Sequence, residues 1–271
     1  MHYKNKKVAV TGHDGFLGSL LCSRLEELGA IVYRLEGDTR DMMTFLPINH
    51  TFSYLFHFGS PSSQVVFKRQ GQYAVDVTVN GFLNASRVCQ RTGVKLVYPS
   101  TGLLSQGKYN EYAMCKKICE DIAPGDSLGL RIFATYGPNE IGKRDYASTP
   151  YLFMRDAQNG KKPVLFGDGK QIRDFIYQDD AIEAILTLAD ECNDKIVDVG
   201  SGQGVSFNQI VKLLGVKPTY IPAPDNYVKE TISNPKVMLK YYKPKVSFEE
   251  GMKRLCEPLL SPLRFTFQSH S

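Results

Sequence analysis

The chain has 271 residues, 42% of them hydrophobic, and a net charge of +5 that comes from 33 basic and 28 acidic residues. This length allows one sizeable core and at most two unequal domains. The basic residues form no block that would indicate nucleic-acid binding, and no apolar run approaches the roughly 18 residues of a membrane-spanning helix. We therefore expect a globular protein with neither a nucleic-acid nor a membrane partner.

The six cysteines are scattered along the chain and include no CxxC pair. Cys115 and Cys119 are four residues apart on a predicted helix, but no nearby histidine or second cysteine pair completes a metal site. The N-terminal segment MHYKNKKVAV lacks the apolar stretch of a signal peptide. We expect free thiols, no bound metal and a cytoplasmic location.

Short apolar runs predict buried strands at 7–12, 30–35, 54–59, 94–100 and 128–137. Helical spacing of apolar residues predicts intervening helices at 16–28, 64–91 and 109–123. This alternation is typical of an α/β fold in which a doubly wound parallel sheet has helices on both faces. From about residue 139 the predicted elements become shorter, which indicates a smaller C-terminal α/β lobe.

A glycine-rich segment, VAVTGHDGFLG, places Gly12, Gly15 and Gly18 between the first predicted strand and the first helix. Glycines in such a turn let the backbone approach a pyrophosphate, and the helix N-terminus offers free N–H groups to the phosphates. A plain tight turn is the alternative. We expect a Rossmann-like dinucleotide-binding domain over 1–138, with later contributions from about 174–202, and a region over 139–271 that is mainly substrate-binding.

An acidic residue, Glu36, follows the second predicted strand. A carboxylate at this place can accept both ribose hydroxyls of an adenosine and would repel a 2′-phosphate. Arg34 and Arg40 are close in sequence and could soften that repulsion, and Glu36 could instead open a solvated turn. The acid nevertheless favours NAD over NADP.

A tyrosine and a lysine, Tyr112 and Lys116, are four residues apart on the predicted helix 109–123 and so share one of its faces. A phenol ordinarily has a pKa near 10, and an adjacent ammonium or a positive nicotinamide ring would lower that pKa. Tyr112 could then take a proton from a sugar hydroxyl. The hydroxyls of the segment PST at 99–101, at the end of the fourth predicted strand, could bridge the substrate oxygen and the phenol.

These motifs together resemble the extended short-chain dehydrogenase/reductase superfamily, and within it the NAD-dependent epimerase/dehydratase family that acts on nucleotide sugars. The segment TGHDGFLG resembles the TGxxGxxG motif of the family, YAMCK its YxxxK motif and RIFATYGP its R-x-F-N-x-Y-G-P motif. The segments HFGSPS at 57–62 and GDGKQIRDFIYQDDAIEAI at 167–185 are also similar to family segments. The resemblance covers about residues 6 to 252.

The resemblance implies a set of site residues. It implies Thr101, Tyr112 and Lys116 as catalytic residues, with Ser100 as the alternative to Thr101. For the substrate, a nucleotide-diphosphate sugar, it implies contacts from Ser62, Thr101 and Arg173, the last gripping the diphosphate. For NAD it implies contacts from Gly12, Gly15, Phe16, Leu17, Gly18, Glu36, Asp38, Thr39, Phe58, Gly59, Ser60, Ser100, Tyr112 and Lys116. It also implies a homodimer that packs the helices at 64–91 and 109–123 of two subunits together.

Several positions depart from the family pattern. The third strand that normally follows the acid is missing, and only ten residues separate Thr101 from Tyr112. Thr78 and Ala134 replace asparagines, and Gly102 stands where dehydratases and decarboxylases carry acids. Water elimination and decarboxylation would therefore lack an acid or base here.

The resemblance and the departures together favour an NAD-dependent epimerase that acts at C4 of the sugar by transient oxidation. A 4-keto-sugar reductase that uses NAD(P)H is the alternative, because it needs the same three side chains. A regulatory dinucleotide-binding protein with weak catalysis is a third possibility, which the two lost asparagines support.

Overall fold

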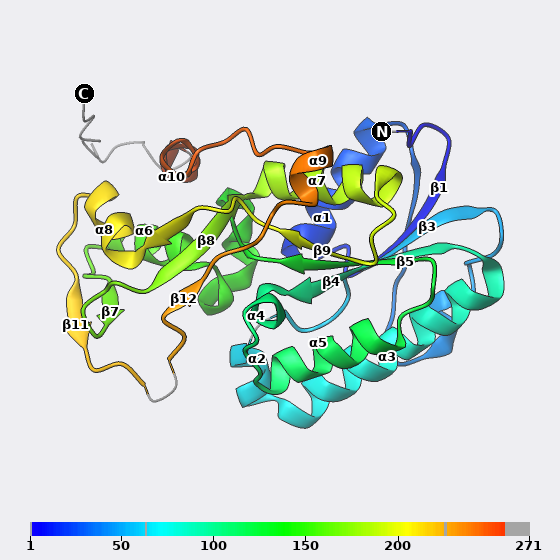
Figure 1. Ribbon diagram of the computed structural model, residues 1–271, viewed down its shortest axis with the longest axis horizontal. Coiled ribbons are helices and arrows are strands. Elements are labelled where there is room, and N and C mark those ends of the chain that lie inside the picture. The colour runs from blue at the N-terminus through cyan, green and yellow to red at the C-terminus, as the bar shows by residue number, and fades with distance from the viewer. Residues whose placement is uncertain (1, 63, 225–226, 258–271) are drawn as a thin grey trace. The chain divides into compact units, whose positions relative to one another are not determined.

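The computed structural model describes residues 2–62, 64–224 and 227–257 (Figure 1). The chain divides into two compact units. The first unit comprises Met1–Ile132, Ile182–Val199 and Pro235–Lys243, and the second comprises Phe133–Ala181, Gly200–Asn234 and Pro244–Ser271. The last part of the expected substrate-binding region, 258–271, lies outside the described residues.

A parallel sheet forms the centre of the first unit, and in the described part of the chain its strand order is β2-β1-β3-β4-β5-β9. Every neighbouring pair of strands in this sheet runs parallel. The strands are β1 (Lys7–Thr11), β2 (Ile31–Arg34), β3 (Phe52–His57), β4 (Lys95–Thr101), β5 (Ser127–Ile132) and β9 (Ile196–Val199).

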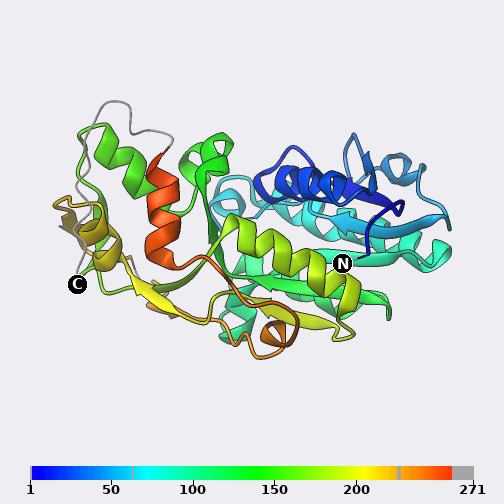
Figure 2. The same ribbon diagram turned by 90° about the horizontal axis from the view of Figure 1, so that it is seen from above.

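Helices cover both faces of this sheet. Helices α3 and α5 pack against each other on one face, and α1 and α7 lie on the other (Figures 1 and 2). Helix α7 (Gln178–Glu191) begins in the second unit and continues into the first. The remaining helices of the first unit are α1 (Phe16–Glu27), η1 (Met42–Phe45), α2 (Gln64–Arg69), α3 (Gly71–Thr92), α4 (Gly102–Ser105), α5 (Glu111–Ile122) and α9 (Met238–Tyr241).

The main core of the first unit lies between the sheet and α3. Leu55 on β3, Leu96 on β4 and Phe82 on α3 belong to one buried cluster. Burying one such side chain stabilises the fold by roughly 1.5–3 kcal/mol. Helix α3 ends at Thr92, because Gly93 has a φ of 72°, which glycine adopts without strain.

Two expected elements are each divided in the structure. The expected helix over 64–91 is two helices, α2 and α3, since Gln70 between them has φ −136° and ψ 42°, outside the helical range. The expected strand over 128–137 is also two strands, β5 and β6 (Ala134–Tyr136), which belong to different sheets. The apolar pattern continues across both breaks, so the sequence alone did not reveal them.

One edge of the sheet is shortened as the sequence indicated. Within the described residues the sheet ends at β2, and the loop and η1 follow where a further strand would pair. The side chains of Ile31 and Tyr33 on β2 are consequently exposed.

The second unit contains small sheets and short helices. Strand β8 pairs with β6 and β12 in parallel and with β10 in an antiparallel arrangement, and β7 pairs with β11 in parallel. Its other elements are η2 (Pro138–Tyr146), α6 (Thr149–Gln158), β7 (Val164–Phe166), β8 (Ile172–Tyr177), β10 (Gly204–Ser206), α8 (Phe207–Leu213), β11 (Thr219–Ile221), β12 (Glu230–Thr231) and α10 (Phe248–Cys256).

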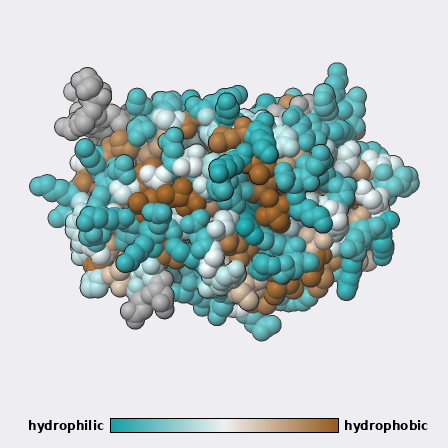
Figure 3. Space-filling model, in the orientation of Figure 1, coloured by the Kyte–Doolittle hydropathy of each residue, from teal (hydrophilic) through white to brown (hydrophobic). Residues whose placement is uncertain are grey.

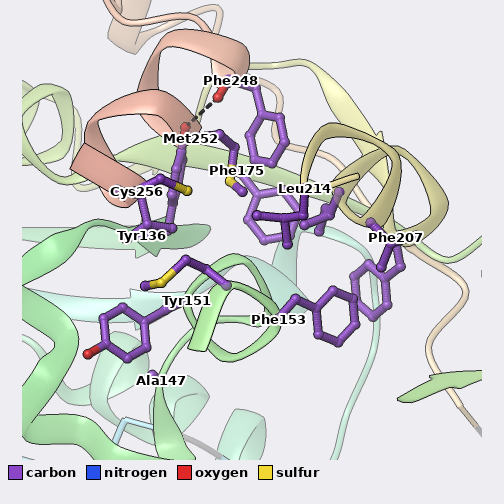
Figure 4. Packing of buried hydrophobic residues seen from close by; sticks show 14 of the residues in the cluster. Tyr136, Ala147, Tyr151, Phe153, Phe175, Phe207, Leu214, Phe248, Met252 and Cys256 are labelled. Carbon is purple, nitrogen blue, oxygen red and sulfur yellow. Dashed lines mark hydrogen bonds between the residues drawn. The ribbon is translucent and has the colours of Figure 1, made fainter. Parts of the chain in front are cut away.

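Aromatic residues fill the core of the second unit. Figure 4 shows Tyr136, Phe175 and Phe248 packed together, with Met252 of α10 beside them. The rings of Tyr136 and Phe248 are 5.3 Å apart, and the Tyr136 hydroxyl donates to the Phe248 carbonyl at 3.1 Å. This hydrogen bond satisfies a phenol that burial would otherwise leave unpaired.

No helix in the described ranges combines the length and the hydrophobicity needed to cross a membrane.

A buried carboxylate joins three segments of the second unit. Asp174 on β8 is fully buried and accepts hydrogen bonds from the backbone N–H groups of Ser201, Gly202 and Ser233 at 2.8 to 3.0 Å. The hydroxyls of Ser201 and Ser233 also donate to it. Without the carboxylate, the N–H group of Ser233, which is buried, would lose its acceptor.

We predict that Asp174→Ala lowers the free energy of unfolding by about 3 kcal/mol, because a buried donor that loses its acceptor bears its full desolvation cost. Urea unfolding followed by circular dichroism measures this change. Asp145→Ala in the same unit is the matched control, since that side chain is 73% exposed and should change stability little. Equal effects of the two substitutions would contradict the prediction.

Candidate active site

A pocket of about 540 Å³ lies at the carboxyl ends of the first three strands of the sheet. In the sheet, β1 lies between β2 and β3, so the chain is connected to β2 on one side of β1 and continues to β3 on the other side. Such a reversal opens a crevice at the strand ends, which is where doubly wound folds bind ligands. The lining residues are Thr11, Gly12, His13, Asp14, Leu35, Glu36, Gly37, Asp38, Thr39, Gly59, Ser60, Pro61, Tyr73 and Val77.

Two glycines are required by close contacts around the β1–α1 turn. Gly12 has a φ of +67°, and a Cβ atom there would lie 2.7 Å from the backbone of Gly59. A Cβ atom on Gly18 would lie 1.9 Å from the carbonyl oxygen of Gly12. The turn therefore packs closely against both the β3 end and helix α1, which begins directly after the lining residues His13 and Asp14.

The residues present fit a dinucleotide. The glycine turn provides backbone N–H groups next to a helix N-terminus, and Glu36 and Asp38 supply carboxylates to the same pocket. Thr39 also lines the pocket, and its buried hydroxyl has no partner within the described residues. Gly12, Glu36, Asp38, Thr39, Gly59 and Ser60, all expected to contact the cofactor, lie together here.

The two arginines near Glu36 are engaged elsewhere. Arg40 binds both oxygens of Asp38 and, at 2.8 Å, a carboxylate oxygen of Asp76, and its guanidinium lies 5.0 Å from the ring centre of Tyr73. These contacts to Arg40 hold the pKa of both carboxyls below the usual range. Arg34 pairs with Glu26 at 2.7 Å. Both cations are thus paired with carboxylates of this chain.

A histidine supports the floor of the pocket. His57 at the end of β3 lies 2.9 Å from the Thr11 hydroxyl through Nδ1, and the N–H of Gly59 donates to the same hydroxyl. Burial, with a smaller effect of Lys116, lowers the pKa of His57 to about 3, so the imidazole is neutral. The contact ties the end of β1 to the end of β3.

The expected catalytic tyrosine lies at the start of α5, beside the end of β4. Asn110 caps this helix by accepting from the N–H of Ala113 at 2.9 Å. Thr101 lies close enough to the Tyr112 phenol to lower the pKa of that phenol. The ring of Phe67 packs edge-on at 5.4 Å from the Tyr112 ring and fixes its orientation. Two expected catalytic residues are thus in contact.

The expected lowering of the tyrosine pKa is wrong for the protein without its cofactor. Burial raises the pKa of Tyr112 to about 12, and the interaction with Thr101 only partly offsets this. Lys116 is also buried, which lowers the pKa of its ammonium. The sequence showed the spacing of the two residues but not the depth at which they lie.

Lys116 connects α5 to the pocket. Its ammonium donates to the hydroxyl of Ser60 at 2.8 Å, and Ser60 lines the pocket. The tyrosine and lysine therefore occupy the same side of the cofactor crevice as the β3 end. Phe58, the residue after β3, donates its N–H to the Thr11 carbonyl. Ser62, an expected substrate contact, is exposed in the loop that follows β3.

Ser100 is turned away from the tyrosine. Its hydroxyl donates to Glu120 on α5 at 2.6 Å, and Arg131 on β5 donates to both oxygens of the same carboxylate at 2.8 and 2.7 Å. Arg131 also reaches Ser105, which donates to Asp198 on β9. This network joins α5 to the sheet and leaves Thr101 as the hydroxyl that contacts Tyr112.

Arg173 lies in the second unit, on β8. Its guanidinium donates to the backbone carbonyls of Ile172 and Val228 at 2.7 Å and stacks 5.7 Å from the ring centre of Tyr227. Burial lowers the pKa of Arg173. Tyr227, with Lys170 and Lys229, lines a separate pocket of about 660 Å³ within this unit.

The sequence did not identify several residues of the cofactor pocket, among them His13, Asp14, Tyr73 and Val77. His13 and Asp14 stand at the variable positions of the glycine motif, where the motif itself gives no signal. Tyr73 and Val77 lie on α3, and only the packing of that helix against the strand ends brings them to the pocket. The glycines Gly15 and Gly18, with Phe16 and Leu17, belong to the turn and the start of α1 rather than to the pocket lining.

We predict that Gly18→Ala lowers the affinity for NADH at least tenfold and destabilises the fold, because the new methyl group meets the Gly12 carbonyl. Gly71→Ala is the matched control: Gly71 also lies in a helix, has open space around its Cα, and should be neutral or slightly stabilised by alanine. NADH fluorescence titration and thermal unfolding measure both effects. Unchanged NADH binding by Gly18→Ala would show that this close approach does not shape the site.

Several known proteins are similar to this chain along most of its length. It is 24% identical to the UDP-N-acetyl-alpha-D-glucosaminuronate decarboxylase of Bacillus cytotoxicus, over 92% of this chain and 96% of that protein. It is 30% identical to the UDP-glucuronate 4-epimerase of Thermodesulfobacterium geofontis, over 66% of this chain and 64% of that protein. The crystal structure of a UDP-glucose 4-epimerase from Thermotoga maritima, solved with UDP-glucose, superposes with a TM-score of 0.85 at 23% identity, covering 94% of this chain and 99% of the other.

The family model gives the most direct assignment. The NAD dependent epimerase/dehydratase family matches residues 8–200, which include the glycine turn, Thr101, Tyr112, Lys116 and Arg173. The match thus contains both the cofactor pocket and the tyrosine–lysine helix. The chain belongs to the NAD-dependent epimerase/dehydratase family.

Proposed function

We propose that this protein is an NAD-dependent nucleotide-sugar epimerase that inverts C4 of the sugar through a transient keto-sugar. The observation that carries the proposal is the proximity of Thr101, at the end of β4, to Tyr112 on α5, the helix whose Lys116 reaches Ser60 in the cofactor pocket. Curated relatives named as a UDP-glucuronate 4-epimerase and a UDP-N-acetyl-alpha-D-glucosaminuronate decarboxylase support a nucleotide-diphosphate sugar as the substrate class.

In the proposed mechanism Thr101, Tyr112 and Lys116 have different roles in the transfer of one proton. Thr101 holds the reacting sugar hydroxyl beside the phenol, and Tyr112 takes the hydroxyl proton and later returns it. Lys116 stabilises the phenolate by its charge and holds the nicotinamide ribose. NAD supplies reversible hydride transfer when bound. The sugar must turn over between the two hydride transfers for C4 to invert.

The raised pKa of Tyr112 sets a condition on this chemistry. In the protein alone the phenol is protonated at neutral pH, because burial raises its pKa to about 12. A positive nicotinamide ring nearby favours the phenolate. The base form is then available when the oxidised cofactor is present, which couples proton removal to the state in which hydride can leave.

The pocket of the second unit is proposed to hold the nucleotide. Arg173 and Tyr227 offer a guanidinium beside an aromatic ring, and Lys170 and Lys229 add positive charge. Aromatic rings stack on bases, and these cations suit a diphosphate. The expected contact of Arg173 with the diphosphate requires it to exchange its present backbone acceptors for phosphate oxygens.

A 4-keto-sugar reductase and a regulatory protein are proposals of lower rank, and decarboxylation ranks below both. A 4-keto-sugar reductase would use the same three residues in one direction and consume NAD(P)H. Decarboxylation, the activity named for one relative, is disfavoured because Gly102 follows Thr101 and supplies no acid. A regulatory protein is supported by Ala134 and by Thr78, whose buried hydroxyl has no partner among the described residues.

Cofactor turnover separates these functions. The purified full-length protein is incubated with UDP-glucose, UDP-N-acetylglucosamine and UDP-glucuronate, and the sugar products are identified by chromatography. An epimerase interconverts 4-epimers without net change in NADH absorbance, whereas a reductase consumes NAD(P)H stoichiometrically with a 4-keto-sugar substrate. Binding of NADH without turnover of any substrate would favour the regulatory protein and overturn the epimerase.

We predict that Tyr112→Phe lowers turnover by at least about 100-fold while the affinity for NADH changes less than threefold, since only the proton-carrying oxygen is lost. Tyr109→Phe is the matched control, because that tyrosine lies three residues away and is 60% exposed. Steady-state rates, measured with the nucleotide sugar that the wild-type protein converts, report turnover. Titration with NADH reports the affinity. Turnover retained by Tyr112→Phe would exclude this residue as the acid and base.

We also propose a homodimer that pairs α3 and α5 of two subunits. Met114 and Ile118, one turn apart on α5, are 49% and 40% exposed, and Val75 on α3 is 37% exposed. Figure 3 shows hydrophobic residues gathered over the side where Figure 1 draws these two helices. Two copies of such a surface could bury each other.

We predict that Ile118→Glu halves the molar mass measured by light scattering on a size-exclusion column, because the carboxylate would be buried without a partner at the interface. Ile141→Glu is the matched control, since Ile141 is 75% exposed and lies on η2 of the second unit. A wild-type protein that is already a monomer would contradict the proposed dimer.

The state of the cysteines relates to the redox conditions of the compartment in which the protein works. All six are buried free thiols, and burial raises the pKa of Cys22, Cys89 and Cys256, which makes these thiols unreactive. We propose a reducing compartment such as the cytoplasm, where thiols of this kind persist.

A further inference from the structure

One arginine connects three parts of the first unit beside the proposed proton relay. Arg131 on β5 donates to both carboxylate oxygens of Glu120 on α5, through Nε at 2.8 Å and through Nη2 at 2.7 Å. Its other terminal nitrogen, Nη1, donates to the hydroxyl of Ser105 on α4 at 3.4 Å. Because a guanidinium is planar and rigid, these contacts hold both helices at set positions relative to β5.

The partners of Arg131 have further contacts of their own. Ser100, the residue opposite Arg131 on β4, donates its hydroxyl to Glu120 at 2.6 Å. Ser105 donates to Asp198, the residue opposite Arg131 on β9, at 2.5 Å. The Glu120 side chain is 5% exposed and that of Arg131 is 22% exposed, so little water competes for these hydrogen bonds. One polar network therefore extends across three adjacent strands.

This network holds both the segment that leads to Tyr112 and the helix that carries it. Only ten residues separate Thr101 from Tyr112, and Ser105 is one of them. Glu120 lies about two turns beyond Tyr112 on the same face of α5, with Lys116 between them. A shift of α4 or α5 would therefore move the phenol relative to the Thr101 hydroxyl.

We propose that Arg131 is a positioning residue, which sets the distance between the Tyr112 phenol and the reacting sugar hydroxyl. It acts through Glu120, on the helix that carries the phenol, and through Ser105, in the segment that leads to that helix. Proton transfer requires hydrogen-bond distance between the two oxygens, and a displacement of about 1 Å can cost about 100-fold in rate. The proposal rests on the proposed role of Tyr112 as acid and base.

A contribution to stability alone is the alternative, because removing one partner of a buried ion pair destabilises a fold. A loss of stability lowers the unfolding temperature but leaves the rate constants of the folded protein unchanged. A loss of position lowers kcat of the folded protein. KM and the affinity for NADH should then stay nearly constant, since neither ligand is proposed to contact Arg131.

Three substitutions separate charge from geometry. Arg131→Lys keeps the positive charge but cannot bind both Glu120 oxygens and Ser105 at once. Glu120→Gln keeps the size of the side chain and removes its charge, and Ser105→Ala removes only the contact with α4. Asp121→Asn is the matched control, because its ion pair with Lys117 lies on the same helix and its side chain is 59% exposed.

The experiment measures kcat and KM of each full-length variant with the nucleotide sugar that the wild-type protein converts, together with NADH affinity and thermal unfolding. We expect Arg131→Lys and Glu120→Gln each to lower kcat at least about tenfold, with KM and NADH affinity changed less than about threefold. The double substitution should lower kcat no further than the stronger single one, since both remove one contact. Ser105→Ala should lower kcat about threefold, because its contact with Arg131 is long. Asp121→Asn should change none of these quantities.

Hydrogen exchange measured by mass spectrometry tests the contact independently of turnover. In Arg131→Lys the backbone amides of α5 should exchange at least about fivefold faster than in the wild type, while those of β1 and α1 keep wild-type rates. Asp121→Asn should exchange as the wild type does. Faster exchange in all these elements, with a lower unfolding temperature and an unchanged kcat, would indicate a role in stability alone and overturn the proposal.

The remaining outcomes decide separate points. A raised KM at unchanged kcat in Arg131→Lys would indicate that Arg131 binds the sugar and would overturn its positioning role. An unchanged kcat in Ser105→Ala would exclude the part assigned to Ser105. No turnover of any nucleotide sugar by the wild-type protein would overturn the proposed function and with it a role in proton transfer, whereas wild-type turnover that Arg131→Lys retains in full would overturn only the role of Arg131.

Discussion

The close approach of the Gly12 backbone to Gly59 is the contact on which the cofactor site depends. It brings the end of β1 within van der Waals distance of the end of β3, and Thr11 and His57 reinforce the contact directly below. Any side chain at Gly12 would separate the two strand ends. The reversal of strand order at β1 creates the crevice, and the lack of side-chain atoms at this one point keeps it open for a dinucleotide.

Helix α5 carries Tyr112 and Lys116, for which we propose the proton chemistry, and buried polar contacts hold this helix against the sheet. Glu120 on this helix binds Ser100 of β4 and Arg131 of β5, while at its other end Tyr112 meets Thr101. The helix is thus fixed at two points along β4. A buried ion pair is costly to form and still more costly to break, and here it sets the position of the phenol.

Much of the fold could be predicted from the sequence, because local hydrophobic periodicity and residue spacing indicate the helices, the strands and the turn. The parallel sheet followed from apolar runs that alternate with helical spacing, and the glycine turn, Glu36, Tyr112 and Lys116 followed from spacing alone. The breaks at Gln70 and Phe133 did not, since hydrophobic periodicity continues across them. The sequence did not indicate that burial raises the pKa of Tyr112, because burial is a property of the folded chain.

The sequence by itself determined the family-like order of motifs, the presence of an acid, Glu36, after the second strand, and the residue types of the proposed proton relay. The tertiary structure decided which of these groups are available. It engaged Arg34 and Arg40 with carboxylates, turned Ser100 toward Glu120 and Thr101 toward Tyr112, and placed His13 against Glu36. The reason is physical: a motif specifies a residue and its spacing along the chain, whereas a hydrogen bond or ion pair depends on distance and burial between segments that only folding brings together.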